Sequence, residues 1–199
     1  REDHVLDADL GASLRQVGAR RGASLFATLL GGFAATLSRL TGQSRLAVGI
    51  PAAGQSIDGH DNLVGHCVNT LPLLFDLDMA KPGVDAIDAA QGTLLDALEH
   101  QRYTFGTLLK KLSIARDPAR LPLISVLFNI DQALDHESAA FAGLELAFSS
   151  NPRSHENFEL FINAVQAHGE LRLECQYNRD LFDADPIGRC MAAYESLLR

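Results

Sequence analysis

Residues 24–42, SLFATLLGGFAATLSRLTG, carry the strongest helical pattern in the sequence. Ser24 suits the N-cap position, and Gly42 suits the position just beyond the last turn. Between them, apolar residues recur at helical spacing, namely Phe26, Leu29, Leu30, Phe33, Leu37 and Leu40. This apolar stripe is wide, so we predict that the helix packs against a β-sheet.

Extended segments lie on both sides of this helix. Residues 46–50 form a short apolar run, and we expect Pro51 to end that strand. Residues 123–130 are apolar and partly β-branched, which indicates a central strand. The complete set of predicted strands is 5–8, 46–50, 68–77, 123–130, 158–165 and 171–177, the last two joined as a hairpin across 167–169.

Four more helices complete the predicted fold. Asp9 is a possible cap for a helix that ends near Arg20, and Pro186 suits the first position of a helix through Leu198. The others cover 84–100 and 105–112. Helices packed on strands, then a hairpin and a closing helix, predict one α/β unit: a two-layer sandwich of a mixed β-sheet with helices on it.

The composition limits the classes of function. The chain has 199 residues, of which 47% are hydrophobic and 21% charged, so it is globular. Its formal net charge is -8 and its 17 basic residues are scattered, which argues against nucleic-acid binding. We expect no signal peptide or membrane segment and a cytoplasmic location. The sequence begins without Met, which suggests a fragment of a longer chain.

Three short patterns could in principle carry chemistry. The run 49–54 has the wrong glycine spacing and a proline, so it does not fit a dinucleotide-binding loop. The run 58–61, DGHD, offers metal ligands, but an exposed turn is the better interpretation and we expect no metal site. Cys67 follows His66, yet adjacent residues on an extended segment point to opposite faces, and a buried structural thiol is favoured. We expect all three cysteines, which include Cys175 and Cys190, to be reduced.

Several polar residues allow two interpretations. Asn69 and Thr70 interrupt an apolar strand, and they either satisfy nearby backbone or line a pocket. His100 and Gln101 lie at a helix end and are followed by the aromatic residues Tyr103 and Phe105. This segment either provides a cation at the negative end of the helix dipole and a hydrophobic anchor, or it forms a binding wall. The charged turn 116–120, RDPAR, precedes the central strand, and a structural ion pair is favoured over ligand contact.

Three segments together are more specific than any one of them. In order, they are 64–71 (VGHCVNTL), His100-Gln101 with Phe105, and 116–123 (RDPARLPL). They resemble the last three motifs of the condensation domains of nonribosomal peptide synthetases. The resemblance extends to the helix 24–42 and to the segment 177–182, so it covers nearly the whole chain.

Four positions depart from the family pattern. Gln55 stands where the family commonly has Arg, and His66 where an aromatic residue is usual. Thr104 and Gly106 replace the usual proline and glutamate. These departures leave the subtype open, so an epimerising, cyclising or ester-forming relative and a carrier-docking module without chemistry remain alternatives.

The resemblance implies a chloramphenicol-acetyltransferase-like lobe. In this family two such lobes face each other across a tunnel, where an upstream acyl or peptidyl thioester is joined to a downstream aminoacyl thioester. The family's catalytic motif, His-His-x-x-x-Asp-Gly, belongs to the N-terminal lobe, and this sequence has no adjacent histidines. Residues 1–199 are therefore expected to be the C-terminal lobe, without catalytic residues of their own and inactive alone.

The resemblance also implies partners and sites. Expected partners are the N-terminal lobe, the upstream and downstream peptidyl carrier proteins and an adjacent adenylation domain. No cofactor is expected to bind directly, because the substrates are tethered to phosphopantetheine on the carriers. Residues 131–157 are expected to cross to the other lobe. Candidate tunnel positions are Gly65, Asn69, Thr70, His100 and Gln101, and candidate structural positions are Arg116, Asp117, Arg120 and Pro122.

Overall fold

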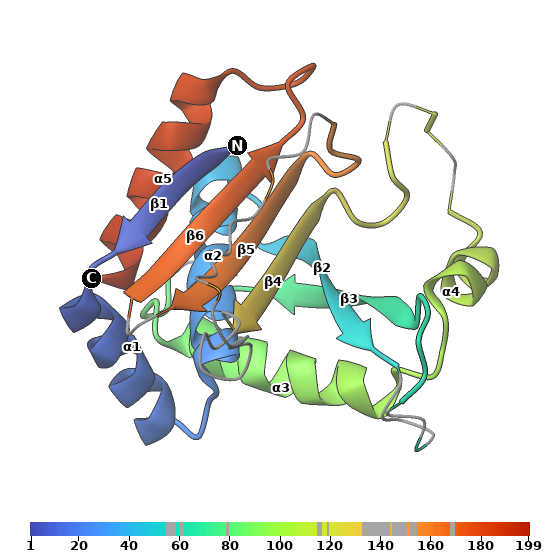
Figure 1. Cartoon of the computed structure of the whole chain (residues 1–199), viewed down its shortest axis with the longest axis horizontal. Coiled ribbons are helices and arrows are strands. Elements are labelled where there is room, and N and C mark those ends of the chain that lie inside the picture. The colour runs from blue at the N-terminus through green and yellow to red at the C-terminus, as the bar shows by residue number, and fades with distance from the viewer. Residues whose placement is uncertain are drawn as a thin grey trace.

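A computed structural model describes residues 1–54, 59, 62–78, 80–114, 117–118, 120–132, 144, 151, 155–167 and 170–199, except for the side chains of Gln132 and Ala167. The elements, in chain order, are β1 (Glu2–Leu6), α1 (Ala8–Arg20), α2 (Leu25–Thr41), β2 (Arg45–Ala53), β3 (Val68–Asp76), α3 (Asp85–Glu99), α4 (Phe105–Leu112), β4 (Val126–Gln132), β5 (Leu160–Ala167), β6 (Glu170–Tyr177) and α5 (Ala184–Leu198) (Figure 1).

The strands form one mixed sheet in the order β1-β6-β5-β4-β2-β3. β4 lies parallel to both β5 and β2, whereas the β1–β6, β5–β6 and β2–β3 pairs are antiparallel. The predicted hairpin pairing of β5 with β6 and the interior place of β4 are both confirmed. β2 and β4 share a single registered pair, Gly49 with Leu127, and the two strands diverge beyond it (Figure 1).

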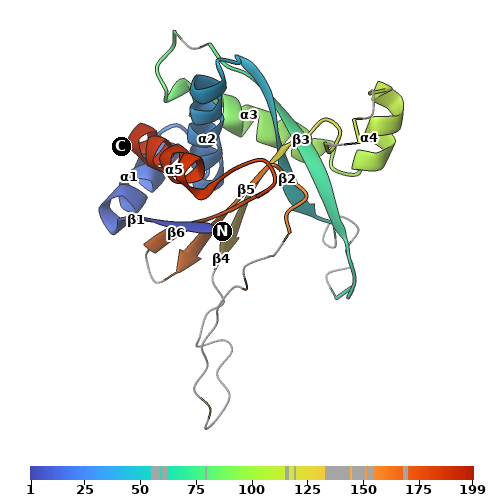
Figure 2. The same ribbon diagram turned by 90° about the horizontal axis from the view of Figure 1, so that it is seen from above.

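The structure has two layers, as the sequence predicts. α1, α2, α3 and α5 gather on one side of the sheet, and α4 stands apart beside β3 (Figure 2). Alternate strand residues such as Leu73, Phe128 and Ile162 are fully buried beneath these helices. We call the other side of the sheet the uncovered face, because none of these helices lies on it.

Helix α2 is the centre of the helical layer, and two of its glycines allow close packing. A Cβ on Gly31 would lie 2.6 Å from the carbonyl oxygen of Ala86, and one on Gly32 would lie 2.6 Å from Leu198 Cδ2. α3 and α5 therefore approach α2 more closely than any side chain would allow. The buried Tyr194 hydroxyl of α5 donates a 2.7 Å hydrogen bond to the carbonyl of Leu29, and burial raises its pKa.

β2 ends later and β4 begins later than the sequence predicts, and β5 is shifted to Leu160–Ala167 from the predicted 158–165. β2 continues through Pro51 to Ala53, because its pairing with β4 is limited to Gly49 and the missing N–H of Pro51 is not needed on that side. β4 begins at Val126 rather than 123, because Leu123 has a φ of 70° and Ile124 N–H donates to the carbonyl of Pro122. This tight turn removes 123–125 from the strand.

The first strand and the starts of two helices also differ from the prediction. The first strand is Glu2–Leu6 rather than 5–8, and Asp7 rather than Asp9 caps α1 by accepting from Leu10 N–H at 2.7 Å. α5 begins at Ala184, so Pro186 is its third residue. A proline is tolerated there because the first four N–H groups of a helix have no partner within the helix.

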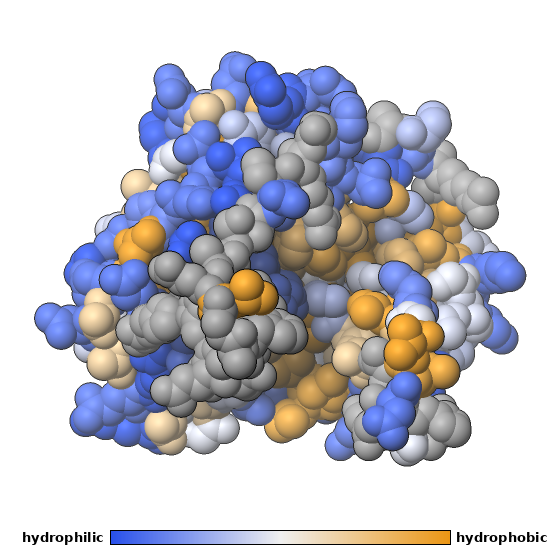
Figure 3. All heavy atoms as spheres, viewed as in Figure 1, coloured by the Kyte–Doolittle hydropathy of each residue, from blue (hydrophilic) through white to orange (hydrophobic). Residues whose placement is uncertain are grey.

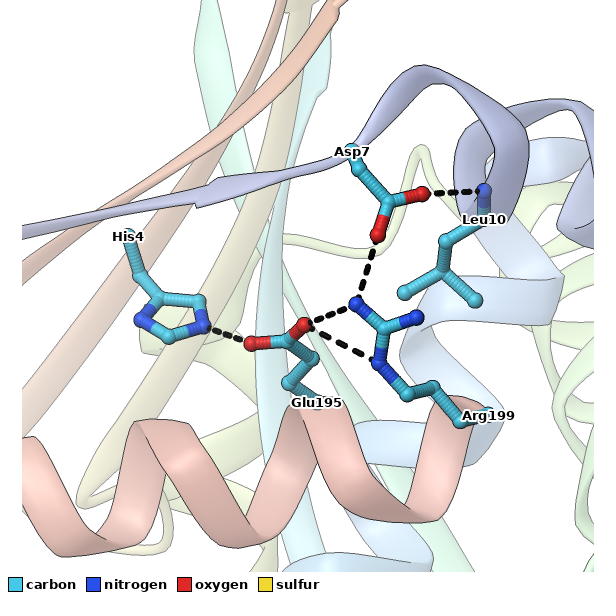
Figure 4. Close-up of polar contacts among 5 residues, drawn as sticks. All are labelled: His4, Asp7, Leu10, Glu195 and Arg199. Carbon is cyan, nitrogen blue, oxygen red and sulfur yellow. Dashed lines mark hydrogen bonds and ion pairs between the residues drawn. The ribbon is translucent and has the colours of Figure 1, made fainter.

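Polar contacts join the first strand to the last helix (Figure 4). Glu195 of α5 accepts from Arg199 at 2.6 Å and lies 2.5 Å from His4 Nε2 of β1. Arg199 also donates to Asp7, the cap of α1, at 2.6 Å. Hydrogen bonds from Arg199 and His4 lower the pKa of Glu195, while the Leu10 N–H and Arg199 lower the pKa of Asp7.

Within the described residues, no helix is by itself long and apolar enough to cross a membrane. Only α1 and α2 taken together reach the required length and composition, and they are bent by 100° relative to each other.

Candidate functional site: the motif junction and the uncovered face

Asn69 connects two of the three motif segments. Its side-chain amide donates to the carbonyls of Gln101 (2.9 Å) and Tyr103 (3.1 Å). Its side-chain oxygen accepts from the N–H groups of Thr70 (3.0 Å) and Phe105 (3.1 Å). The start of β3 is thereby tied to the α3–α4 connection, and the Asn69 side chain is committed to main-chain groups.

Thr70 has the opposite orientation. Leu71 and Leu73 point into the core beneath the helices, so Asn69 shares their side of the strand and Thr70 points to the uncovered face. There Thr70 is half-buried and lies opposite Pro51 of β2. Asn69 and Thr70 are adjacent polar residues that interrupt the same apolar strand, but their side chains lie on opposite faces of the sheet.

α4 joins the second motif segment to the third. Thr104, where the family usually has proline, caps α4 by accepting from Thr107 N–H at 3.3 Å. A cavity of about 520 Å³ lies between the helix and the turn that follows it. Its lining residues are Gly106, Leu109, Lys110, Ile114, Asp117, Pro118 and Pro122. The three segments are thus continuous in space, and we call them the motif junction.

The third segment contacts the start of β5 as well. Arg120 Nε lies 3.3 Å from Glu159 Oε1, and the Arg120 N–H closes a turn by donating to the carbonyl of Asp117. Glu159 N–H donates to the carbonyl of Ser125 at 2.8 Å. These contacts position the entry of β4 beside β5.

The remaining predicted site residues have less defined surroundings. His100 is exposed, and its Nδ1 lies 2.9 Å from the carbonyl of Asp96 in the helix that it ends. Gly65 is exposed, and a Cβ there would meet no atom within 4 Å. Arg116 lies outside the described residues. The roles of His100 and Gly65 as tunnel positions and of Arg116 as a structural position stay predictions.

The uncovered face has its own apolar cluster, outside the main core. Leu127 and Phe161 are paired across β4 and β5 and are buried, and Ile124 is 1% exposed. Gly49 provides the space for this cluster, because a Cβ there would lie 2.7 Å from Ile124 Cγ2 and 2.9 Å from Leu127 Cδ1. Apolar surface gathers in a hollow over the middle of this face (Figure 3). Leu74 of β3, 56% exposed, adds to the apolar side chains on it.

A polar network lies next to this apolar cluster. Asn129 Nδ2 donates to Asp131 Oδ1 and to Asn163 Oδ1, and Asn163 Nδ2 donates to Asp131 Oδ2, each at 2.9 Å. We call these three residues the amide–carboxylate cluster. The sequence interpretation missed it, although Asn129 and Asp131, two positions apart in an apolar strand, were a signal for two of its three members.

Other candidate groups lie away from the junction or have no clustered partners. The three cysteines are free, and only Cys175 is fully buried; Cys67 is half-buried, so the prediction of a buried thiol there is wrong. Burial raises the pKa of Cys175 to about 12. Among the described residues, no group of three His, Cys, Asp or Glu side chains could hold a metal ion, and Asp58, His60 and Asp61 fall outside them.

The motif junction lies beside a mixed β-sheet that has one uncovered face (Figure 2). The "Condensation domain" family matches residues 1–199. The chain belongs to the condensation-domain family.

Two curated relatives are peptide synthases. Tyrocidine synthase 3 of Brevibacillus parabrevis is 31% identical over 186 residues, which are 94% of this chain and 3% of that protein. Bacitracin synthase 1 of Bacillus licheniformis is 30% identical over 194 residues, which are 98% of this chain and 4% of that protein. The chain therefore spans only a small part of the length of either relative.

Solved structures confirm the fold. Holo-AB3403, a four-domain nonribosomal peptide synthetase bound to AMP and glycine, superposes with a TM-score of 0.89 over 99% of this chain and 16% of its own, at 20% identity. The condensation domain of the monacolin K polyketide synthase MokA gives a TM-score of 0.85 at 19% identity. The chain covers 45% of that protein, which is less than half of its length.

Proposed function

We propose that this chain is the C-terminal half of a condensation domain that forms amide bonds in nonribosomal peptide synthesis. In the intact domain, an upstream acyl or peptidyl thioester would be transferred to the amine of a downstream aminoacyl thioester. Both substrates would be held on peptidyl carrier proteins through phosphopantetheine. An adenylation domain would be a further neighbour in the synthetase.

The family match along the whole chain is the observation that carries this proposal. Its coverage of 45% of the MokA condensation domain supports an assignment to one half rather than to a complete domain. The absence of adjacent histidines in the 199 residues supports the same assignment, since the expected catalytic motif belongs to the other lobe.

In the proposed mechanism this half positions the substrates. The uncovered face would form one wall of the tunnel, and the N-terminal lobe would form the opposite wall and supply the histidine motif. The sequence predicts that residues 131–157 cross between the lobes, but Asp131 and Gln132 belong to β4, so the crossing segment would begin after them; most of that segment lies outside the described residues. Catalysis of this kind depends mainly on holding two reactants in attack geometry, an effect worth up to about 7–11 kcal/mol of barrier.

Reconstitution tests this proposal. The chain is produced alone, with the N-terminal half of its own domain as a separate polypeptide, and within the intact domain. Each form is given an upstream carrier protein loaded with an acyl group and a downstream carrier loaded with an aminoacyl group. We expect amide product from the intact domain and from the two halves combined, and none from the chain alone.

Other outcomes separate the alternatives. Amide product from the chain alone would overturn the assignment of catalysis to the other half. Inversion of the substrate's α-carbon, a cyclic product or an ester in place of the amide would identify an epimerising, cyclising or ester-forming relative. Carrier binding without any product from the intact domain would favour a docking module.

A further inference from the structure

The amide–carboxylate cluster lies on the uncovered face of the sheet. It runs from the middle of the parallel strands β4 and β5, at Asn129 and Asn163, to Asp131 near the carboxyl end of β4. Asn129 and Asp131 share the side of β4 that carries Leu127, and Asn163 shares the side of β5 that carries Phe161. β2 diverges from β4 just before this point. In α/β sheets, the carboxyl ends of diverging parallel strands are a common place for ligands.

The free hydrogen-bonding capacity of the cluster is mostly that of an acceptor. Asn129 uses both of its amide hydrogens within the cluster, whereas no described residue donates to its Oδ1. Each oxygen of Asp131 accepts one hydrogen bond from an asparagine and keeps a second lone pair. Within the cluster, the side-chain donor left over is one hydrogen of Asn163.

Two residues of β6 on the same face are further acceptors, while Arg172, opposite Val165 in the register, is an exposed cation on that face. Gln176 lies opposite Phe161 in the register, is 8% exposed, and its buried Oε1 accepts no hydrogen bond from the described residues. Glu174 lies opposite Asn163, is 5% exposed, and has Arg1 at 3.6 Å. A buried carbonyl oxygen without a donor is unfavourable, so the Gln176 side chain is complementary to an N–H donor.

We propose that the amide–carboxylate cluster binds the amine of the downstream aminoacyl group. Asp131 and Asn129 Oδ1 accept hydrogen bonds from the amine, and the two asparagines hold the Asp131 carboxylate in a fixed orientation. The nitrogen lone pair then points away from the sheet, toward the upstream thioester. This inference rests on the proposed amide-forming function, and these residues position the amine rather than form the bond.

The test compares two ligands that differ by an amine. The downstream carrier protein is loaded with alanyl or with propionyl phosphopantetheine, each through a stable amide linkage, and its binding to the intact condensation domain is titrated. We expect the wild-type domain to bind the alanyl carrier about tenfold to a hundredfold more tightly, as charge-assisted hydrogen bonds are worth. Asp131→Asn should bring the two affinities within about twofold of each other by weakening alanyl binding alone.

Asp76→Asn is the matched control. Asp76 is also a strand aspartate, in β3. Its Oδ2 lies 3.8 Å from Arg45 Nε, and both side chains are strongly exposed. This variant should keep the wild-type preference for the alanyl carrier. If Asp131→Asn lowers the melting temperature of the domain, Asn129→Ser removes the free Oδ1 acceptor instead and should weaken the same preference.

Three results would overturn the inference. The first is a wild-type domain that does not distinguish the two carriers. The second is an Asp131→Asn domain that keeps the full preference. The third is a variant that weakens the binding of both carriers equally and also weakens the association with the N-terminal half. That result would make the cluster a contact between lobes. A domain that prefers the alanyl carrier but makes no amide would contradict the proposed function and still support the amine-binding site.

Discussion

The two faces of the sheet differ in the side chains that they carry and in what covers those side chains. On the helix-covered face, every strand contributes to one apolar core, which includes the fully buried Leu6, Leu73, Phe128, Ile162 and Leu173. On the uncovered face, a small apolar cluster around Leu127 lies beside a polar network that has free acceptors. On the helix-covered face, the helices of this chain bury the apolar side chains. The uncovered face combines features that suit a ligand and a second protein surface.

This difference indicates that residues on one side of the strands stabilise the fold, while residues on the other side of the same strands are available for binding. Side chains alternate along a strand, so neighbouring residues belong to different environments. Substitutions on the covered face should therefore change the free energy of unfolding of the chain. Substitutions on the uncovered face should change mainly what the intact domain binds.

Leu73 and Leu74 provide the strongest test of this separation. Leu73 is fully buried on the covered face, and Leu74 is 56% exposed on the other. Leu73→Ala should lower the free energy of unfolding by about 2–5 kcal/mol, whereas Leu74→Ala should change it by less than about 0.5 kcal/mol. Urea denaturation of the isolated chain measures both. Equal losses would show that the uncovered face is as important for stability as the core.

Two glycines test the packing of the covered side. Gly31→Ala places a methyl group against the backbone of Ala86 and should cost about 1–3 kcal/mol. Gly92→Ala, on the exposed side of α3 with no atom within 4 Å, should instead stabilise the chain by about 0.5–1 kcal/mol. Thermal denaturation distinguishes the two. A stabilising Gly31→Ala would contradict the close approach of α2 and α3.

Asn69 and Thr70 test the separation between two adjacent residues. Asn69→Asp keeps the acceptor but loses the hydrogen bonds to Gln101 and Tyr103, and should cost about 1–3 kcal/mol. Hydrogen exchange should show faster exchange of the α4 amides in this variant. Thr70→Val should leave that exchange unchanged. Protection of α4 that does not change in Asn69→Asp would show that Asn69 does not hold the junction together.

The smallest effect is expected at Glu195, in the contacts between β1 and α5. Its pKa is lowered below the ordinary value of 4.5, so its interactions stabilise the fold above that pH and are lost as the pH falls through the lowered pKa. Glu195→Gln should lower the melting temperature by about 1–4 °C at pH 7, and the difference from wild type should shrink toward pH 3. Glu170→Gln, at an exposed position, is the control. A difference that does not depend on pH would exclude this ionic contribution.

Periodicity was sufficient to predict the elements but not all of their ends. The α2 helix, with its cap Ser24 and terminal Gly42, was predicted correctly because each signal is local. The β4 boundary was not, because the positive φ of Leu123 depends on packing of the turn against the sheet. The prediction for Pro51 was wrong for a similar reason, since the sequence does not show that β2 loses its partner beyond Gly49.

The site was predictable only in part. The three motif segments were found from the sequence, but their continuity was not. It depends on the contacts of Asn69, which join residues more than 30 positions apart, and on the cavity beside α4. The amide–carboxylate cluster depends on the register of β4 with β5, which brings Asn129 opposite Asn163. Register between strands that are distant in sequence is set by the packed sheet, and no local pattern contains it.

The contacts of Asn69 also have a consequence for protein engineering. All four of its partners are main-chain groups, so the connection does not depend on which side chains follow α3. Residues 101–103 can therefore be diversified in a library without losing their attachment to the sheet, provided that Thr104 is kept as the cap of α4 and that position 105 keeps its N–H and is not proline. The segment would act as a replaceable loop on a fixed anchor, suited to altering what the surrounding surface recognises.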